Sequence, residues 1–174
     1  MKLWWIDVET TGLSTNRDEL LEIAVSTAQF DTPFDATPVY HRVIEFPPPW
    51  RPGAQNPQMS DFVREMHTKS GLLDECARSG VARMVMVGEL EKLIPHDPAN
   101  NILAGSSVHF DRGFLPYTIA PRFSHRHYDV SSIKLFCESL GMPKIPKDEA
   151  HRAQADVLES IEHARRCEQW LAQR

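Results

Sequence analysis

Two acidic residues lie two positions apart in the stretch IDVETTGL, near the start of the chain. The apolar residues around Asp7 and Glu9 predict a strand, and because side chains alternate along a strand, both carboxylates would share one face. If that face is covered, the two charges repel each other and each loses hydration. A bound cation would compensate for both costs; the alternative is a solvent-exposed polar face.

Three later residues carry matching chemistry. Asp111 follows a short apolar run, and Asp156 lies at the start of the last expected helix, with His151 five residues before it. A mixed sheet brings strand ends and helix starts to one edge, where these residues can meet Asp7 and Glu9. Taken singly, Asp111 would be a helix-start acid favoured by the helix dipole, and the His151–Asp156 pair would mark a solvated helix face.

Together, the four carboxylates point to a hydrolytic metal centre. Four acids in one cleft would be strongly destabilising without cations, and hard oxygen ligands suit Mg²⁺ or Mn²⁺. The sequence has no Cys and His cluster that would favour a structural zinc site. Two divalent ions about 3.5–4 Å apart can clamp the attacking and leaving oxygens of a phosphodiester. One ion lowers the pKa of a water, and His151 is the candidate base that removes its proton near neutral pH.

The elements that would position these residues follow from the hydrophobic pattern. Residues 2–8 predict a buried strand, TTGLSTNRD (10–18) a turn, and residues 19–30 and 39–46 two further strands. These three strands suggest an antiparallel meander. The proline-rich segment PPPWRPGAQNP (47–57) is expected to be a surface loop.

The second half of the chain alternates between helical and strand patterns. A helix is expected over 71–79, capped by Ser70, and the next helix would carry Met84, Val87, Leu90 and Ile94 on one face. A strand over 102–106, a helix over 109–119 and a strand ending near HYD follow, and then a helix capped by Ser131 or Ser132 and stopped by Gly141 and Pro143. The last helix is expected over 152–171, with Val157, Ile161, Ala164 and Leu171 on one stripe. This order predicts a mixed α/β sheet, with helices on both faces if the later strands are parallel.

The composition is that of an ordinary soluble globular protein. The 174 residues are 41% hydrophobic and 25% charged, and most simply form one domain. The net charge of −5 argues against a basic surface that grips long nucleic acid, although a metal-loaded site could still handle phosphate. No apolar run reaches membrane-spanning length, and the start MKLWWIDVE meets an acid before a signal-peptide core could form. Cys76, Cys137 and Cys167 are expected to be reduced thiols, which indicates a cytoplasmic location.

The order of the acids and the histidine resembles that of a known group of enzymes. D-x-E-T-T-G near the start, an acid in an F-D pair near the middle of the sequence and a terminal H-x₄-D resemble the DEDDh group of 3′→5′ exonucleases. Within it the chain is most similar to the oligoribonuclease family, which degrades RNA fragments of a few nucleotides. The matching segments occur in the expected order: VREMHTKSGL (63–72), SSVHFDRGFL (106–115), HRHYDVSSIKL (125–135) and AHRAQADVLES (150–160). General proofreading exonucleases do not usually carry the first of these segments.

The resemblance implies a fold and an activity. The fold would be a ribonuclease H-like mixed five-stranded sheet flanked by helices, in a single DEDDh exonuclease domain over residues 1–174. The activity would be hydrolysis of the 3′-terminal phosphodiester of short single-stranded RNA to 5′-mononucleotides. His151 would be the general base, and two divalent metal ions, Mg²⁺ or Mn²⁺, would be held by Asp7, Glu9, Asp111 and Asp156.

The resemblance also implies substrate-binding residues. Leu13 matches a leucine that wedges against the substrate bases, and His67 matches a histidine that lines the pocket. Ser107, Arg126 and Ser131 match positions that cap the 5′ phosphate of a short substrate. In the family, Arg126 and its neighbours reach into the site of a partner subunit, which implies a homodimer.

Four further substrate-binding positions depart from the family pattern. Phe62 stands where the family usually has a tryptophan for base stacking, and a phenylalanine keeps the apolar face with less area. His125 replaces a tyrosine that arrives from the partner subunit, and Phe110 replaces a glutamine beside Asp111. Thr10 replaces a methionine, as in proofreading exonucleases or ribonuclease T.

Two other functions stay open on the sequence alone. One is a general 3′→5′ exonuclease acting on longer DNA or RNA ends, which Thr10, Phe62 and His125 favour. The other is a non-catalytic nucleic-acid-binding module, against which the complete set of acids and histidine argues. Ordinary structural roles are also open for a buried turn leucine at Leu13, a core aromatic at Phe62, helix caps at Ser107 and Ser131, and a surface charge at Arg126.

Overall fold

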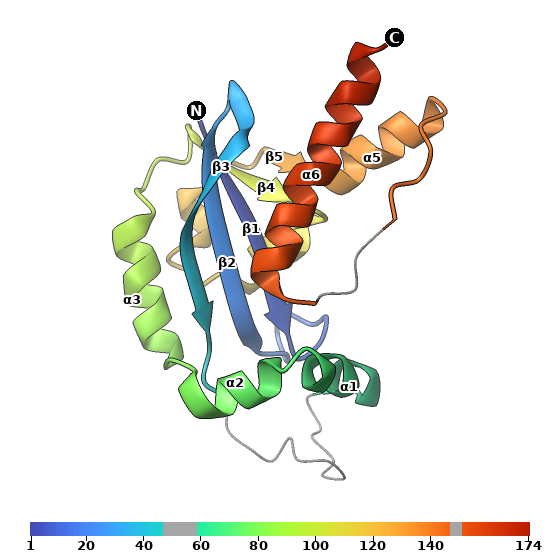
Figure 1. The fold of residues 1–174 in the computed structure, drawn as a ribbon. Coiled ribbons are helices and arrows are strands. Elements are labelled where there is room, and N and C mark those ends of the chain that lie inside the picture. Colours follow the sequence, from blue (N-terminus) through green and yellow to red (C-terminus); the bar gives the residue numbers. More distant parts are fainter. Residues whose placement is uncertain (47–58, 147–150) are drawn as a thin grey trace.

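The computed structural model describes residues 1–46, 59–146 and 151–174. The predicted surface loop over 47–57 lies outside these residues. Within them, five strands form one sheet, and helices cover both of its faces (Figure 1). The mixed α/β architecture predicted from the sequence is therefore confirmed.

The sheet has the strand order β3-β2-β1-β4-β5. Its strands are β1 (Lys2–Thr10), β2 (Leu20–Gln29), β3 (Thr32–Val43), β4 (Asn101–Gly105) and β5 (His127–Asp129). The first three strands pair antiparallel, as the predicted meander requires, whereas β4 and β5 run parallel to β1. The central strand β1 thus has an antiparallel neighbour on one side and a parallel neighbour on the other.

The third strand is longer than the pattern over 39–46 predicted. It begins at Thr32 and contains Pro33 and Pro38, which the sequence pattern did not assign to a strand. Because β3 is an edge strand, its prolines need not donate to a further neighbour. The register also shifts opposite Ser26, which pairs with Pro38.

The helices divide between the two faces of the sheet. They are α1 (Asp61–Lys69), α2 (Leu72–Ser79), α3 (Arg83–Leu93), α4 (Val108–Phe114), α5 (Val130–Ser139) and α6 (Ala153–Ala172), with a short 3₁₀ turn at Ala120–Arg122. Trp4, Ile6 and Val8 of β1 pack in a core with α3 and α4. Leu3 and Trp5 point to the other face, where the core includes residues of α6. The same alternation places Asp7 and Glu9 on the α6 face.

Helix starts differ from those predicted. Ser70 ends α1 instead of capping α2, whose N-cap is Gly71 with a left-handed φ of 75°. The cap of α5 is Asp129, whose carboxylate accepts a hydrogen bond from Ser132 N, so neither predicted serine is the cap. The carboxylate is the better acceptor for the unpaired amides of a first turn, and it lies directly at the end of β5.

The predicted buried faces of helices α3 and α6 were each wrong at one residue. Met84 is exposed and Met86 is buried, because the face of α3 that packs on the sheet is set by Met86 and Leu90. Leu171 lies beyond the sheet near the end of α6 and is partly exposed. Helix α4 ends at Phe114, shorter than the predicted 109–119, because Pro116 cannot continue the helix.

Two further predictions concern the state of the cysteines and the absence of a membrane-spanning segment. Cys76, Cys137 and Cys167 are buried free thiols. Among the helices in the described parts of the chain, none is long and apolar enough to cross a membrane.

Candidate active site

The candidate site lies where β1 extends beyond its parallel neighbour. The β1–β4 pairing reaches Trp5 opposite Ala104, and β4 then ends at Gly105. A Cβ on Gly105 would lie 2.7 Å from the carbonyl oxygen of Ile6, so only glycine fits this crossing. Asp7 therefore projects past the end of β4, at the carboxyl edge where α/β sheets commonly bind ligands.

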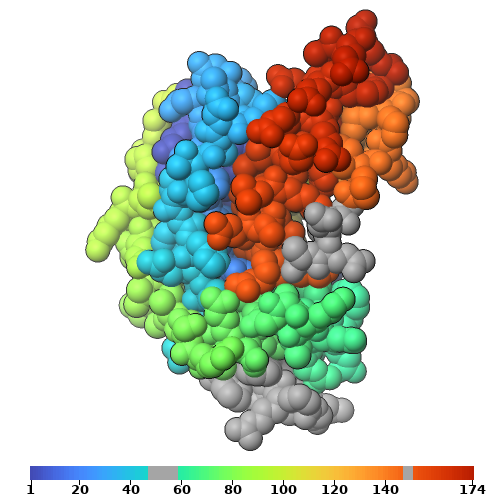
Figure 2. Space-filling view, in the orientation of Figure 1, coloured from blue at the N-terminus to red at the C-terminus, as the bar shows by residue number. Residues whose placement is uncertain are grey.

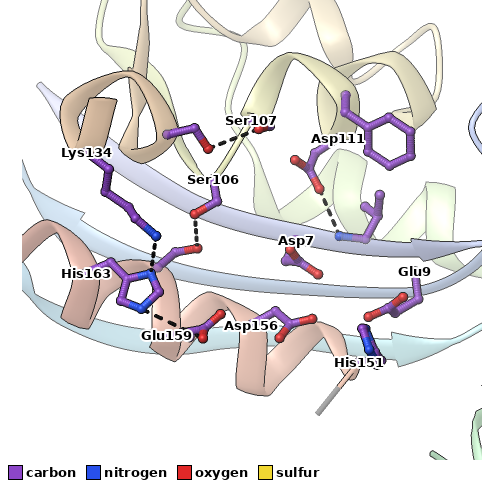
Figure 3. Close-up of a pocket in the computed structure, with 14 residues that line it drawn as sticks. Asp7, Glu9, Ser106, Ser107, Asp111, Lys134, His151, Asp156, Glu159 and His163 are labelled. Atoms are coloured by element: carbon purple, nitrogen blue, oxygen red, sulfur yellow. Dashed lines mark hydrogen bonds and ion pairs between the residues drawn. The ribbon is translucent and has the colours of Figure 1, made fainter. Parts of the chain in front are cut away.

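Three carboxylates converge at this edge from two elements. Asp7 and Glu9 come from β1, and Asp156 comes from the first turn of α6. One oxygen from each of the three lies within 4.8 Å of the other two. Figure 3 shows these side chains directed into the same space. The convergence predicted from the sequence is thus present for these three acids.

Asp111 approaches the same space from the opposite wall. It lies on α4 and is buried, and its Oδ1 accepts a hydrogen bond from Val8 N at 3.0 Å. Burial raises the pKa of the Asp111 carboxyl to about 7, and the negative charges of Asp129 and Asp156 add to the rise. A cation beside Asp111 would favour its ionised form and offset this cost.

His151 lies directly before α6 and lines the same pocket. Its backbone has a φ of 46°, which is left-handed and sterically disfavoured for a residue with a side chain. Figure 3 shows the imidazole on the Glu9 side of the acidic group. The five residues predicted as the catalytic set therefore line one pocket.

The pocket has a volume of about 420 Å³ and is mostly polar. Its described lining residues are Asp7, Val8, Glu9, Ser106, Ser107, Phe110, Asp111, Ser131, Lys134, His151, Asp156, Glu159, Ser160 and His163. The lining comes from β1, from the turn after β4, from α4 and α5, and from α6 with His151 two residues before it. Five separate parts of the fold therefore shape it.

Three of the predicted substrate-binding residues line this pocket. Ser107 lies in the turn after β4 and Ser131 in the first turn of α5, and their hydroxyl oxygens are 3.0 Å apart. Phe110 packs against Phe114 with the ring centres 5.0 Å apart. Ser107 does precede α4, but its hydroxyl makes no capping hydrogen bond and its φ is 57°. Its hydroxyl instead pairs with that of Ser131.

Thr10 and His67 lie next to Glu9, at the end of β1. Both are buried, and His67 Nε2 donates a hydrogen bond to the Thr10 carbonyl oxygen at 2.9 Å. His67 Nε2 also lies 3.9 Å from Glu9 Oε2. Burial lowers the pKa of His67, although the hydrogen bond to the Thr10 carbonyl acts in the opposite direction. His67 thus holds the end of β1 through the Thr10 carbonyl. It is not among the described residues that line the pocket.

Besides Thr10 and His67, four further predicted substrate-binding residues lie outside the described lining of the pocket. Leu13 follows β1 and is 84% exposed, and Phe62 on α1 is 74% exposed. Neither is the buried packing residue that the ordinary structural alternative required. His125 and Arg126 precede β5, and both are exposed.

The sequence reasoning missed several polar residues of the pocket. Glu159 and His163 follow Asp156 by three and seven positions, the spacing of one helical face, which was a usable signal. His163 Nε2 lies 3.8 Å from Glu159, and its Nδ1 lies 3.4 Å from Lys134 Nζ. Burial lowers the pKa of His163, and the positive charge of Lys134 lowers it further. Lys134 had no signal of its own in the sequence.

The donor set fits a hard divalent cation. Asp7, Glu9 and Asp156 offer carboxylate oxygens at mutual distances that one ion could bridge, and Asp111 adds a fourth acid. The described lining contains no cysteine that would favour a softer metal. The arrangement can therefore bind divalent metal and place a histidine beside it.

Comparisons with known proteins decide the family. The chain matches the family model described as "Exonuclease" (RNase_T) over residues 4–163. The oligoribonuclease of Leifsonia xyli is 38% identical over 92% of this chain and 79% of its own length. The oligoribonuclease of Tropheryma whipplei is 36% identical over 91% of this chain and 87% of its own length. The chain belongs to the oligoribonuclease family. It is therefore a 3′→5′ exonuclease by family, as the resemblance had implied.

Solved structures show the same fold at low sequence identity. Escherichia coli exonuclease I in complex with a dT13 oligonucleotide aligns with a TM-score of 0.67 at 15% identity, covering 99% of this chain and 42% of that chain. The RNase domain of the yeast Pop2 protein aligns with a TM-score of 0.63 at 13% identity, covering 98% of this chain and 77% of that chain. This chain thus matches less than half of exonuclease I. The predicted ribonuclease H-like fold of this oligoribonuclease-family chain is confirmed.

Proposed function

We propose that this chain hydrolyses short single-stranded RNA from the 3′ end and releases 5′-mononucleotides. The observation that carries the proposal is the convergence of Asp7, Glu9 and Asp156 within 4.8 Å, in a pocket that Asp111 and His151 also line. The relatives at 36–38% identity are oligoribonucleases, which supports short RNA as the substrate. The exonuclease domain would extend over residues 1–174.

Metal ions complete the proposed chemistry. Asp7, Glu9, Asp111 and Asp156 would hold two divalent cations, Mg²⁺ or Mn²⁺. When bound, such ions lower the pKa of a coordinated water and neutralise charge that develops on the phosphodiester oxygens. The sequence order and the oxygen-only donor set of the three converging acids support this assignment.

The chain's own side chains would divide the remaining work. His151 would take a proton from the attacking water, because an imidazole titrates near neutral pH. The hydroxyls of Ser107 and Ser131, 3.0 Å apart on the pocket wall, would donate hydrogen bonds to the 5′ phosphate of a short substrate. Leu13 and Phe62 would contact the bases, since both present large exposed apolar surfaces.

A short substrate suits the size and charge of the molecule. The pocket of about 420 Å³ cannot enclose a long chain, and the net charge of −5 provides no long basic track for one. Thr10, Phe62 and His125 favour the alternative, a general 3′→5′ exonuclease that trims longer DNA or RNA, and Thr10 also has a structural role. The Thr10 hydroxyl donates a hydrogen bond to the Gly12 carbonyl oxygen at 2.7 Å and thereby shapes the turn after β1.

The proposal includes a homodimer in the cytoplasm. His125 and Arg126 are exposed and do not belong to the described lining of the pocket. Exposure of this kind is compatible with residues that act on a partner subunit's site, as the family resemblance implies. The relatives are bacterial proteins, which is compatible with a cytoplasmic enzyme.

Substrate length can be tested with product ladders. RNAs of two, five and twenty nucleotides, each with a 5′ phosphate, are incubated with the protein and Mn²⁺ or EDTA, and products are followed over time. We expect rapid metal-dependent loss of the two-mer while the twenty-mer is largely spared. Equal or faster trimming of the twenty-mer, or of a DNA twenty-mer, would favour the general exonuclease and overturn the short-RNA proposal.

A further inference from the structure

We propose that Glu22 and Arg152 form a positioning pair that holds His151 in place for catalysis. The inference rests on the proposed role of His151 as the general base. Neither Glu22 nor Arg152 is among the described residues that line the pocket, so the pair would act through its neighbour in the chain.

Glu22 is an acid buried in the middle of the fold. It lies on β2 with only 1% of its surface exposed, in a run that otherwise carries apolar core residues. Arg152 Nε lies 3.1 Å from Glu22 Oε2 and Arg152 Nη2 lies 2.9 Å from Oε1, which makes a two-pronged ion pair. His41 Nε2 lies 2.7 Å from Oε1 on the other side. The donors on both sides hold the Glu22 carboxylate in one position.

The protonation state of the pair is settled by these contacts. Burial by itself would raise the pKa of Glu22, but the hydrogen bonds from Arg152, His41 and Ala153 N lower it below its ordinary value. The same ion pair raises the pKa of Arg152. Both groups are therefore charged at neutral pH.

Glu22 holds the chain at both residues that follow His151, through the side chain of Arg152 and the backbone of Ala153. The Glu22 carboxylate accepts a hydrogen bond from Ala153 N at 3.0 Å, and so caps the first turn of α6 in place of a local side chain. Arg152 reaches beyond Glu22 to Glu75 of α2, with Nη2 2.7 Å from Oε2. Figure 2 shows the start of α6 against the surface of α2. The start of α6 is thereby tied to both β2 and α2.

His151 needs such an anchor because its own conformation is strained. A φ of 46° persists in a residue with a side chain only where surrounding contacts impose it. The next residue, Arg152, has the extended φ of −137° and carries the anchoring guanidinium. Loss of the ion pair would let the His151 backbone relax and move the imidazole away from the attacking water.

The test is a double-mutant cycle on Mn²⁺-dependent cleavage of a 5′-phosphorylated RNA two-mer. We expect Arg152→Gln to lower kcat about 10- to 100-fold, because a displacement of about 1 Å can cost 10²-fold in rate. KM should change less than about threefold, since the pair does not touch substrate. In the His151→Ala background, Arg152→Gln should cause no further loss, because the group that it positions is already absent.

A matched control and a milder variant separate positioning from folding. Arg42→Gln removes an equally two-pronged pair, with Arg42 Nε and Nη2 at 2.9 and 3.1 Å from Glu89, between β3 and α3 away from the pocket. It should leave kcat unchanged. Arg152→Lys keeps the charge but not the planar fork, so its kcat should lie between wild type and Arg152→Gln. This second variant serves if Arg152→Gln does not fold.

The outcomes distinguish failure of the pair from failure of the base. An equal loss of kcat from Arg152→Gln with and without His151, or wild-type kcat in both Arg152 variants, would overturn the positioning role. The second of these results, together with a large loss in His151→Ala, would leave the proposed base intact. Full activity in His151→Ala would overturn the base assignment and the positioning role together.

Discussion

Leu13 and Phe62 are large apolar side chains that the fold leaves exposed, at 84% and 74%. Such side chains contribute little to a core, because burial of apolar surface is what stabilises the folded chain. A substitution at either position can therefore change substrate binding while leaving the stability of the fold nearly unchanged. For this reason they offer a clean test of base stacking in the proposed enzyme.

Leu13→Ala and Phe62→Ala should weaken substrate binding without destabilising the protein. Stacking of a base on an apolar or aromatic side chain is worth about 1–3 kcal/mol, so KM for an RNA two-mer should rise about 5- to 100-fold. The free energy of unfolding should change by less than about 0.5 kcal/mol, as for other exposed positions. Phe30→Ala, a change at an aromatic side chain that is 46% exposed, is the control and should leave KM unchanged. Unchanged KM in both site variants would exclude contact with the bases.

The residues that meet in the candidate site were predictable because residue type and chain order carried the signal. Asp7 and Glu9 are unusual acids in an apolar strand, and Asp156 and His151 stand at a helix start. The roles of Glu22 and Arg152 were not predictable, because the partners lie 130 residues apart and the contact exists only after folding. His67 could be matched to the family, but its burial beneath Thr10 could not be read from its neighbours.

At the scale of elements, β2 and α6 are joined by a buried contact outside the pocket itself. Glu22 on β2 caps α6 through Ala153 N and pairs with Arg152, so one carboxylate joins the two elements. Removal of the Glu22 charge should therefore lower both the free energy of unfolding and kcat.

Glu22→Gln should lower the free energy of unfolding of the metal-free protein by about 1.5–3 kcal/mol at pH 7, the range for hydrogen bonds to charged groups. The contacts lower the pKa of Glu22 in the folded state, so its contribution is complete above the ordinary value of 4.5 and is lost as pH falls below it. The difference between wild type and variant should therefore stay constant from about pH 7 to 5 and shrink at lower pH.

Urea unfolding in EDTA at several pH values measures this difference. Glu162→Gln, at an exposed ion pair on α6, is the control and should cost less than about 1 kcal/mol. A Glu22→Gln effect that grows as pH falls below 4.5 would contradict the assignment of an ionised, hydrogen-bonded Glu22.

Element order and type were largely predictable, whereas the ends of the elements were not. The alternation of apolar residues fixed β1 and β2, and the helical stripe of Val157, Ile161 and Ala164 fixed the buried face of α6. The cap of α5 was missed because Asp129 also accepts a hydrogen bond from Val108 N at 3.1 Å, a contact with α4 that local patterns do not show. Tertiary contacts of this kind choose between neighbouring cap candidates.

At the scale of the whole molecule, the acidic pocket predicts that stability depends on bound metal. The carboxylates of Asp7, Glu9 and Asp156 are brought within 4.8 Å by folding alone, so their repulsion opposes the folded state until cations bind. A cation that binds only the folded chain stabilises it by mass action.

Mn²⁺ at 100 times its dissociation constant should raise the free energy of unfolding by about 2.7 kcal/mol. Thermal unfolding with Mn²⁺ and with EDTA measures the change. Asp156→Asn should remove most of the increase, whereas the control Glu162→Gln on the same helix should retain it. An Asp156→Asn protein that gains as much stability from Mn²⁺ as wild type would place the metal elsewhere.

The most direct test of the account is the rate at which Asp111→Ala cleaves a 5′-phosphorylated RNA two-mer in Mn²⁺, beside the wild-type protein. Asp111 lies on the wall opposite the three converging acids, and only a site built from all four carboxylates requires it. We predict rapid cleavage by the wild-type protein and none above the EDTA background by Asp111→Ala. Cleavage by the folded variant at a rate comparable to wild type would contradict the four-carboxylate metal site.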